Sequence, residues 1–318
     1  MPRRKVMKAT AAEVPSYSVP LSDIVDSLSL MRVAGGQLDL TSVRVSTSEV
    51  NRPGLQLTGF TEHFNPGRLQ IIGWTETAYL SALDPATRAQ RLDAYFALEF
   101  PALIVARGLH VMPDMVEAAD RHDVPVLVTD VQTSQFAGAL NWYLIHELAP
   151  RQTVHAGLVD VYGEGVLILA EQAVGASETA LELVRRGHRL ISDSEVEVLR
   201  ISEQSLRGRA PQGRGFVIDI PGVGRVDVEE LFGIGAIKGD QAISFVVVLE
   251  MRDWEKEYER VGIDEHFQEV LGVPVPKVTV PVQPGRNLAV IIEAAALNHR
   301  LRERGYNAAA DINRRITG

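Results

Sequence analysis

The stretch Gly165-Val-Leu-Ile-Leu169 is followed directly by Ala170-Glu-Gln-Ala-Val-Gly-Ala-Ser177, and these two segments decide the fold. The first is short, apolar and rich in branched side chains, which predicts a buried strand. Residues 178–186 then continue with a helical pattern. The order strand, loop, helix is the context in which a phosphate-binding loop occurs, and it predicts an α/β domain.

The loop matches the phosphate-binding pattern G-x-x-x-x-G-K-[ST] only in part. In the intact pattern the glycines let N–H groups converge on phosphate, the Lys neutralises its oxygens, and the Ser or Thr hydroxyl binds Mg²⁺. Here the first Gly and the Lys are both replaced by Ala, while the second Gly and the Ser remain. The predicted nucleotide-binding residues, the last of them also a metal ligand, are Ala170, Glu171, Gln172, Ala173, Val174, Gly175, Ala176 and Ser177.

The substitutions in this loop predict weak nucleotide chemistry. An alanine forced to a positive φ costs about 1–2 kcal/mol, so Ala170 and Ala173 predict an altered loop path. The change at Ala176 matters more, because a positioned cation contributes several kcal/mol to phosphoryl transfer and a methyl group contributes none of it. We therefore expect little or no ATP-dependent activity.

Five segments of the chain resemble the HPr kinase/phosphorylase family. Residues 153–165, 177–189, 231–236 and 277–293 are similar to its catalytic domain, and residues 51–59 to its N-terminal domain. That family phosphorylates a serine of the phosphocarrier HPr in bacterial sugar-transport (carbon catabolite) regulation and reverses the reaction by phosphorolysis. The nearly full-length resemblance implies Mg²⁺ and ATP as cofactors, HPr as partner, and a homohexamer built from the C-terminal domains.

The chain is predicted to form two α/β domains, since 318 residues suit two domains of ordinary size. Residues 1–20 lack a sustained period and predict a flexible N-terminal tail. In residues 21–150 apolar runs alternate with helical patterns, which predicts an N-terminal α/β domain with a mainly parallel sheet. Residues 151–318 are predicted to be a P-loop-type α/β kinase domain, with a last helix over 308–316.

Composition excludes several classes of function. A net charge of −9 argues against a nucleic-acid-binding surface. The absence of cysteine removes disulfides and thiolate chemistry and fits a reducing compartment. No run approaches the roughly 18 apolar residues that a membrane span needs, and the basic N-terminus lacks the apolar core of a signal peptide. We therefore expect a cytoplasmic protein with neither a membrane nor a nucleic-acid partner.

Three predicted catalytic residues flank the loop. His155 lies 21 positions before Ala176, the spacing at which the family carries its active-site histidine before the Lys. An imidazole there could hydrogen-bond phosphate or steer protons, although a structural histidine at a strand end is the alternative. Asp193 and Ser194 stand where the family has two aspartates, the second acting as base. A serine hydroxyl cannot replace that base, and Asp193 either substitutes in part, binds metal, or is a solvated turn carboxylate.

Three further positions correspond to active-site residues of the family, and two of them carry a different residue type here. Asp219 stands where the family has a metal-ligating Glu, and a shorter carboxylate can still bind Mg²⁺ if the backbone moves about 1 Å. Pro221 replaces an Arg, and Arg225 is not expected to compensate, because strand alternation need not direct it to the same pocket. Arg260 matches an arginine that the family uses in its active site.

One more segment matches the family's loop for dephosphorylation. Its residues are Pro281, Val282, Gln283, Pro284, Gly285 and Arg286, with Gln where Arg or Lys is common. Arg286 is able to form bidentate phosphate contacts, and the Asn287 side chain can cap the helix that follows. The alternative for Arg286 is a solvated or ion-paired surface group.

Two functions of different classes remain open from the sequence. The first is an active HPr serine kinase/phosphorylase that tolerates its altered loop. The second is a pseudoenzyme that keeps the framework, the oligomer and an HPr-binding surface but has lost nucleotide chemistry. The losses at Ala176, Ser194 and Pro221 cluster at the chemical centre while framework segments are retained, which favours the second.

Overall fold

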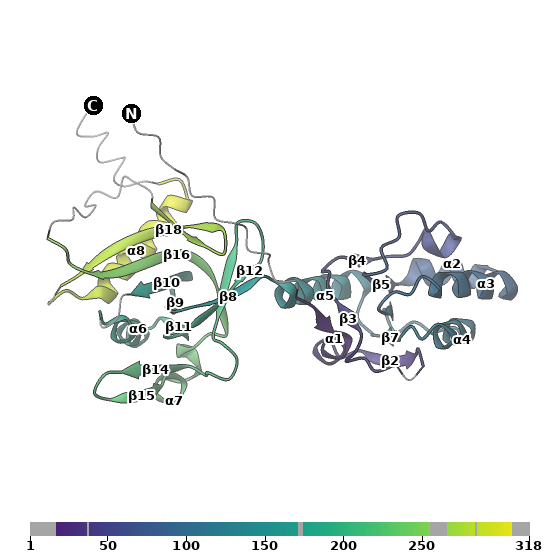
Figure 1. Cartoon of the computed structure of the whole chain (residues 1–318), viewed down its shortest axis with the longest axis horizontal. Helices are drawn as coiled ribbons and strands as arrows, with labels where there is room; N and C mark the ends of the chain where they lie inside the picture. The colour runs from purple at the N-terminus through teal and green to yellow at the C-terminus, as the bar shows by residue number, and fades with distance from the viewer. Residues whose placement is uncertain (1–16, 37, 171–173, 255–265, 284, 307–318) are drawn as a thin grey trace, which may run out of the picture. The chain divides into compact units, whose positions relative to one another are not determined.

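The computed structural model describes residues 17–36, 38–170, 174–254, 266–283 and 285–306. The chain forms two compact units, Met1–Ala149 and Pro150–Gly318, and each is α/β (Figure 1). The helix predicted over residues 308–316 lies outside the described residues, as do most of the predicted tail residues 1–20.

The first unit contains a five-stranded sheet in the order β2-β7-β6-β5-β4. Four of its strands are parallel and β2 runs antiparallel to β7, which confirms the mainly parallel sheet expected from the alternating pattern. The bounds of these strands are β2 Met31–Ala34, β4 Val50–Asn51, β5 Leu69–Ile72, β6 Leu103–Val105 and β7 Val126–Val128.

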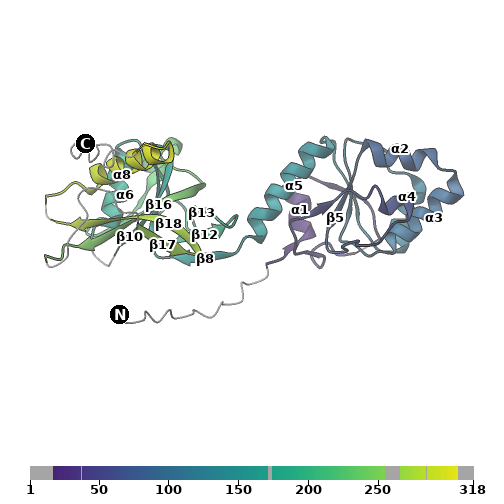
Figure 2. The same cartoon turned by 90° about the horizontal axis from the view of Figure 1, so that it is seen from above.

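Helices cover both faces of this sheet, as Figure 2 shows from above. Successive strand side chains point to opposite faces. Leu69 and Ile71 therefore pack with the first helix group, whereas Ile72 packs with the second. The first group is α1 (Leu21–Ser27) and α5 (Thr133–Leu148); the second is α2 (Trp74–Ala82), α3 (Pro85–Phe96) and α4 (Pro113–Arg121).

The first unit begins slightly earlier than the sequence predicted. Val19–Pro20 form β1, which pairs antiparallel with β3 (Arg44–Val45). Val19 is only 6% exposed and packs into the core beside α1. The predicted boundary at residue 21 is therefore two residues late, because an apolar side chain is anchored by a pairing distant in sequence. A short turn of 3₁₀ helix, η1, spans Gln56–Thr58.

The second unit contains a nine-stranded sheet built around two adjacent parallel pairs, β10 with β16 and β16 with β18. The remaining pairs are antiparallel. The strand bounds are β8 Arg151–Val154, β9 Gly157–Val161, β10 Glu164–Ala170, β11 Arg189–Ser192, β12 Val196–Arg200, β13 Leu206–Arg209, β16 Asp240–Met251, β17 His266–Val270 and β18 Val273–Val282.

Two helices, α6 (Ala176–Arg185) and α8 (Leu288–Glu303), cover one face of this sheet. Ile168 of β10 and Val247 of β16 pack against these helices. Their neighbours Leu167 and Val246 face the opposite side of the sheet and belong to a second apolar cluster. A separate two-stranded hairpin pairs β14 (Val217–Ile220) with β15 (Gly224–Asp227). Helix α7 (Val228–Phe232) and the 3₁₀ turn η2 (Ile234–Ala236) follow the hairpin.

The parallel strands β10, β16 and β18 end at the same edge of the sheet. The predicted phosphate-binding loop follows β10, and the predicted dephosphorylation loop includes the end of β18 and the residues after it. The topology therefore brings together two segments that lie more than a hundred residues apart. Among the described residues, no helix combines the length and the apolar character needed to cross a membrane.

Candidate functional site

A groove of about 550 Å³ lies between the starts of α6 and α8. Gly175 and Thr179 line it from the α6 side, and Arg286 and Asn287 line it from the α8 side. Asn287 caps α8, because its side-chain oxygen accepts a hydrogen bond from the Val290 N–H at 3.3 Å. The predicted Arg286 and the predicted loop residue Gly175 therefore face one open space.

The loop before α6 differs from the expectation of a strained Ala170. Ala170 is the last residue of β10 and pairs with Leu249, so its backbone is extended. The prediction of a positive-φ penalty there is wrong, because the strand continues through this position. Gly175 does have a left-handed backbone, with φ 81°, and its carbonyl accepts a 2.6 Å hydrogen bond from Thr179 Oγ1. Glu171, Gln172 and Ala173 lie outside the described residues.

A hydrogen bond joins Ser177 at the start of α6 to Asp193. Ser177 Oγ donates to Asp193 Oδ2 at 2.8 Å, and Ser194 Oγ donates to the same oxygen at 3.2 Å. Asp193 is 4% exposed and follows directly after β11. The interpretation of Asp193 as a solvated turn carboxylate is therefore wrong, because residues from α6 and its own turn enclose it.

The surroundings of Asp193 change its acidity. Burial raises the pKa of this carboxyl above its usual value, and hydrogen bonds from Ser177, Ser194 and the backbone of Asp219 only partly oppose that rise. Burial disfavours the charged form because a carboxylate loses its hydration. When Asp193 is ionised, its burial therefore lowers the stability of the folded protein.

Asp193→Asn should stabilise the protein at neutral pH. Between the unfolded and the raised folded pKa, the native state keeps a proton that the unfolded state has released, so wild-type stability falls as pH rises through this window. The advantage of the variant should therefore grow from about pH 4 and level off above the folded pKa. Urea unfolding of both proteins at several pH values measures the difference, and an advantage independent of pH would contradict this assignment.

His155 lies in the bend between β8 and β9 and its side chain is exposed. The next residue, Ala156, donates its backbone N–H to the Ser194 carbonyl at 3.2 Å. The backbone beside His155 is thus fixed to the turn that carries Asp193. The structure therefore places His155 at a strand end on the surface, next to a residue whose backbone contacts the turn of Asp193.

Asp219 contacts Asp193 through its backbone, whereas its side chain pairs with Arg225. It is exposed in β14, and the Arg225 Nε lies 3.2 Å from its Oδ1. The two residues are directly opposite in the hairpin, which the turn-rich stretch Pro221-Gly-Val-Gly224 could have signalled. Arg225 thus forms an exposed ion pair with the carboxylate that was predicted as a metal ligand, a pairing that the sequence did not indicate.

The segment with Gln283 contributes a polar pair at the sheet edge. Pro281 and Val282 are the last residues of β18. In the amide orientation that satisfies both groups, Gln283 accepts a 2.7 Å hydrogen bond from Arg252 Nε. The Arg252 guanidinium lies 4.2 Å from the centre of a ring of Trp254. Arg252 was missed by the sequence analysis, although a basic residue directly after an apolar strand was visible.

Arg260 and Pro284 lie outside the described residues, so their predicted roles stay predictions.

The arrangement suits a magnesium ion better than it suits phosphate. A serine hydroxyl and a carboxylate are oxygen ligands of the kind that hold Mg²⁺ beside phosphates and water. Ser177 and Asp193 are the residues that would hold it. The position of the phosphate-binding Lys is Ala176, the first residue of α6, and it supplies no charge. Arg286 is the cation that lines the groove across from it.

Comparison with known proteins identifies the family. The family described as HPr Serine kinase N terminus matches residues 19–144, and that described as HPr Serine kinase C-terminal domain matches residues 146–316. The HPr kinase/phosphorylase of Caldanaerobacter subterraneus subsp. tengcongensis is 46% identical over 274 residues, covering 86% of this chain and 90% of its own. That of Thermoanaerobacter sp. is 43% identical, covering 94% and 97%.

The structure of the Hpr(Ser) kinase/phosphatase from Coxiella burnetii also matches, at 34% identity with a TM-score of 0.45, covering 51% of this chain and 98% of its own. On the family matches and the two relatives, the chain belongs to the HPr kinase/phosphorylase family.

Proposed function

We propose that this protein is a catalytically impaired member of its family that acts in carbon catabolite regulation by binding HPr. The observation that carries the proposal is Ala176 at the start of α6, where a phosphate-binding loop requires a Lys. The loop's strand, its helix and the Ser177–Asp193 contact all remain in place. Because the fold around the loop is kept and only the Lys side chain is missing, we infer that the protein folds normally but has lost catalytic power.

The size of the expected loss supports this choice. The cation contributes several kcal/mol to the transition state, and the general base contributes roughly 10²–10⁴-fold in rate. Ser194 stands at the position of that base and its hydroxyl donates to Asp193. A protein lacking both groups retains little turnover, even if Mg²⁺ binds.

An active serine kinase and phosphorylase is the second candidate, and one observation favours it. Asp193 is buried against Ser177 and its pKa is raised. A carboxyl with a raised pKa is better matched to proton transfer near neutral pH. In this alternative Asp193 takes the role of the missing base, Arg286 neutralises phosphate, and ATP or pyrophosphate is the phosphoryl donor.

The proposal extends to the partners. The relatives carry HPr in their names, and HPr is the proposed partner of this chain. A cytoplasmic homohexamer built from the second units is the proposed assembly, and light scattering of the purified protein at micromolar concentration tests it. A monomer there would contradict the proposed assembly without affecting the family assignment.

Calorimetry separates recognition of HPr from recognition of nucleotide. We expect HPr to bind with micromolar affinity, and Mg²⁺–ATP to give no measurable heat at millimolar concentration. The reason is that HPr contacts a surface, whereas the nucleotide depends on the phosphate-binding loop. Binding of Mg²⁺–ATP with micromolar affinity would contradict the proposal, and absence of HPr binding would remove HPr as the partner.

A further inference from the structure

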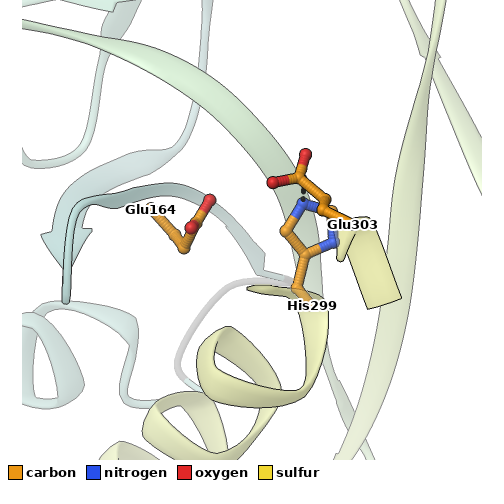
Figure 3. A group of neighbouring side chains, drawn as sticks. All are labelled: Glu164, His299 and Glu303. Carbon is orange, nitrogen blue, oxygen red and sulfur yellow. Dashed lines mark ion pairs between the residues drawn. The ribbon is translucent and has the colours of Figure 1, made fainter. Parts of the chain in front are cut away.

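Glu164, His299 and Glu303 converge on one point of the second unit, away from the groove residues described above (Figure 3). Glu164 is the first residue of β10, and His299 and Glu303 lie one turn apart near the end of α8. Residues four apart on a helix lie on the same face. One ligand atom from each of the three side chains lies within 4.8 Å of the others.

His299 is held in place and has an unused nitrogen. Its ring lies against Phe245, with ring centroids 5.1 Å apart, and its side chain is 15% exposed. Its Nε2 atom is buried and makes no hydrogen bond within the described part of the chain. A buried polar atom without a partner costs roughly 1–3 kcal/mol. Coordination of a metal ion would satisfy this nitrogen, because imidazole is a common metal ligand.

The distances are close to those of a coordination site. His299 Nε2 lies 3.6 Å from Glu303 Oε1. Two ligands of one tetrahedral zinc ion, each about 2.0–2.2 Å from it, are roughly 3.3–3.5 Å apart. These two side chains therefore need almost no movement, and the ligand atom of Glu164 lies within 4.8 Å of both.

The charges at this cluster also suit a cation. Two carboxylates are present, and Arg300 Nε lies 3.6 Å from Glu164 Oε1. The same Arg300 donates from Nη1 to the Tyr162 carbonyl at 3.1 Å, so the backbone also holds it. With a neutral imidazole, the side chains of Glu164, Glu303 and Arg300 carry one net negative charge. A divalent ion would reverse that sign and satisfy both carboxylates.

We propose that Glu164, His299 and Glu303 bind a divalent transition metal of the zinc class, with water completing its coordination. One nitrogen and two carboxylate oxygens suit zinc better than magnesium, which takes oxygen ligands. The ion would tie the start of β10 to the end of α8. Strand β10 precedes the loop before α6, and α8 starts beside Arg286. A metal ion bound to both elements would therefore restrict the motion of β10 and α8 relative to each other, and both lead to the groove.

The test uses the full-length protein freed of metal by a chelator. Zinc titration by calorimetry should show one zinc ion per chain, and zinc should raise the melting temperature. His299→Gln should weaken zinc binding by roughly tenfold or more, since even outer-shell changes at metal sites cost that much. Glu303→Gln should do the same, and its 63% exposed side chain makes misfolding of that variant a minor concern.

His110→Gln is the matched control, because this exposed histidine lies in the first unit. The His110→Gln variant should bind zinc as tightly as the wild type. Excess Mg²⁺ should not displace zinc from the wild type or from this variant. If zinc bound instead at Ser177 and Asp193, affinity would survive both His299→Gln and Glu303→Gln. That result, or the absence of zinc binding by the wild type, would overturn the proposal.

Discussion

Ala176→Lys should tighten Mg²⁺–ATP binding by roughly a hundredfold, because it returns a cation to the start of α6. Ser177 and the N-terminus of the helix already offer a hydroxyl and a favourable dipole to a phosphate group. Ala176 is only partly buried, so a longer side chain has room to extend. Calorimetric titration of the variant with Mg²⁺–ATP measures the gain.

Ala170→Gly is the matched control for that gain. Ala170 is extended within β10, so adding Ala170→Gly to the Ala176→Lys variant should leave that variant's affinity for Mg²⁺–ATP unchanged. Ala170→Gly and Ala176→Lys together complete the phosphate-binding pattern of the loop. If a folded Ala176→Lys variant still bound no ATP, the absence of the cation would not be the cause.

Recovery of activity should require Ser194→Asp in addition. Loop residues bind phosphate in the ground state, whereas the base acts mainly in the transition state. Ser194 has a left-handed backbone with φ 66°, a conformation that Asp tolerates better than most residues. Phosphorylation of HPr by the combined variant should therefore exceed that by Ala176→Lys alone by about 10²-fold or more.

Glu293→Gln should destabilise the second unit by about 2–4 kcal/mol, because it breaks a largely buried charge pair. Glu293, on α8, accepts hydrogen bonds from Arg186 Nη2 at 2.6 Å, Arg186 Nε at 2.9 Å and His188 Nε2 at 3.0 Å. The Arg186 side chain keeps 35% exposure, so the loss should fall below that of a fully buried pair. Urea unfolding measures it.

The stability lost in Glu293→Gln should also depend on pH. Hydrogen bonds from Arg186 lower the pKa of Glu293 to about 2, with His188 acting in the same direction and burial against it. The stabilisation is therefore present above the usual carboxyl pKa and is lost as pH falls through about 2. The stability difference between wild type and variant should shrink progressively below about pH 5.

Glu182→Gln is the control for this network. Glu182 pairs with Arg185 and Arg186 along the surface of α6, and such pairs contribute about 0.3–0.5 kcal/mol. If Glu182→Gln cost as much as Glu293→Gln, the buried position of Glu293 would not be the source of its effect.

The elements with strong patterns were predictable from the sequence. The run Val-Leu-Ile-Leu before Ala170 is β10, and the apolar positions after Asn287 form α8 with the predicted cap. Antiparallel strands such as β8 and β13 were missed. Each is short and carries charged or polar residues, so neither shows a hydrophobic period.

The candidate site could be predicted in its residues but not in its contacts. Asp193 reads as a turn residue in its own segment, and only its contact with Ser177, sixteen positions earlier, shows that it is enclosed. The pairing of Asp219 with Arg225 depends on the register of a hairpin. The His299–Glu303 spacing is visible in the sequence, whereas Glu164 reaches it only through the fold. Contacts of this kind arise from tertiary packing.

The central claim is that this family member has lost most of its phosphoryl transfer. It is tested most directly by incubating the purified protein with HPr, Mg²⁺ and either ATP or pyrophosphate, and measuring phosphoserine on HPr by mass spectrometry. A relative with an intact phosphate-binding loop serves as the positive control. We predict that HPr remains unphosphorylated with this protein while the control phosphorylates it. A serine phosphorylation rate within about tenfold of the control would contradict the account.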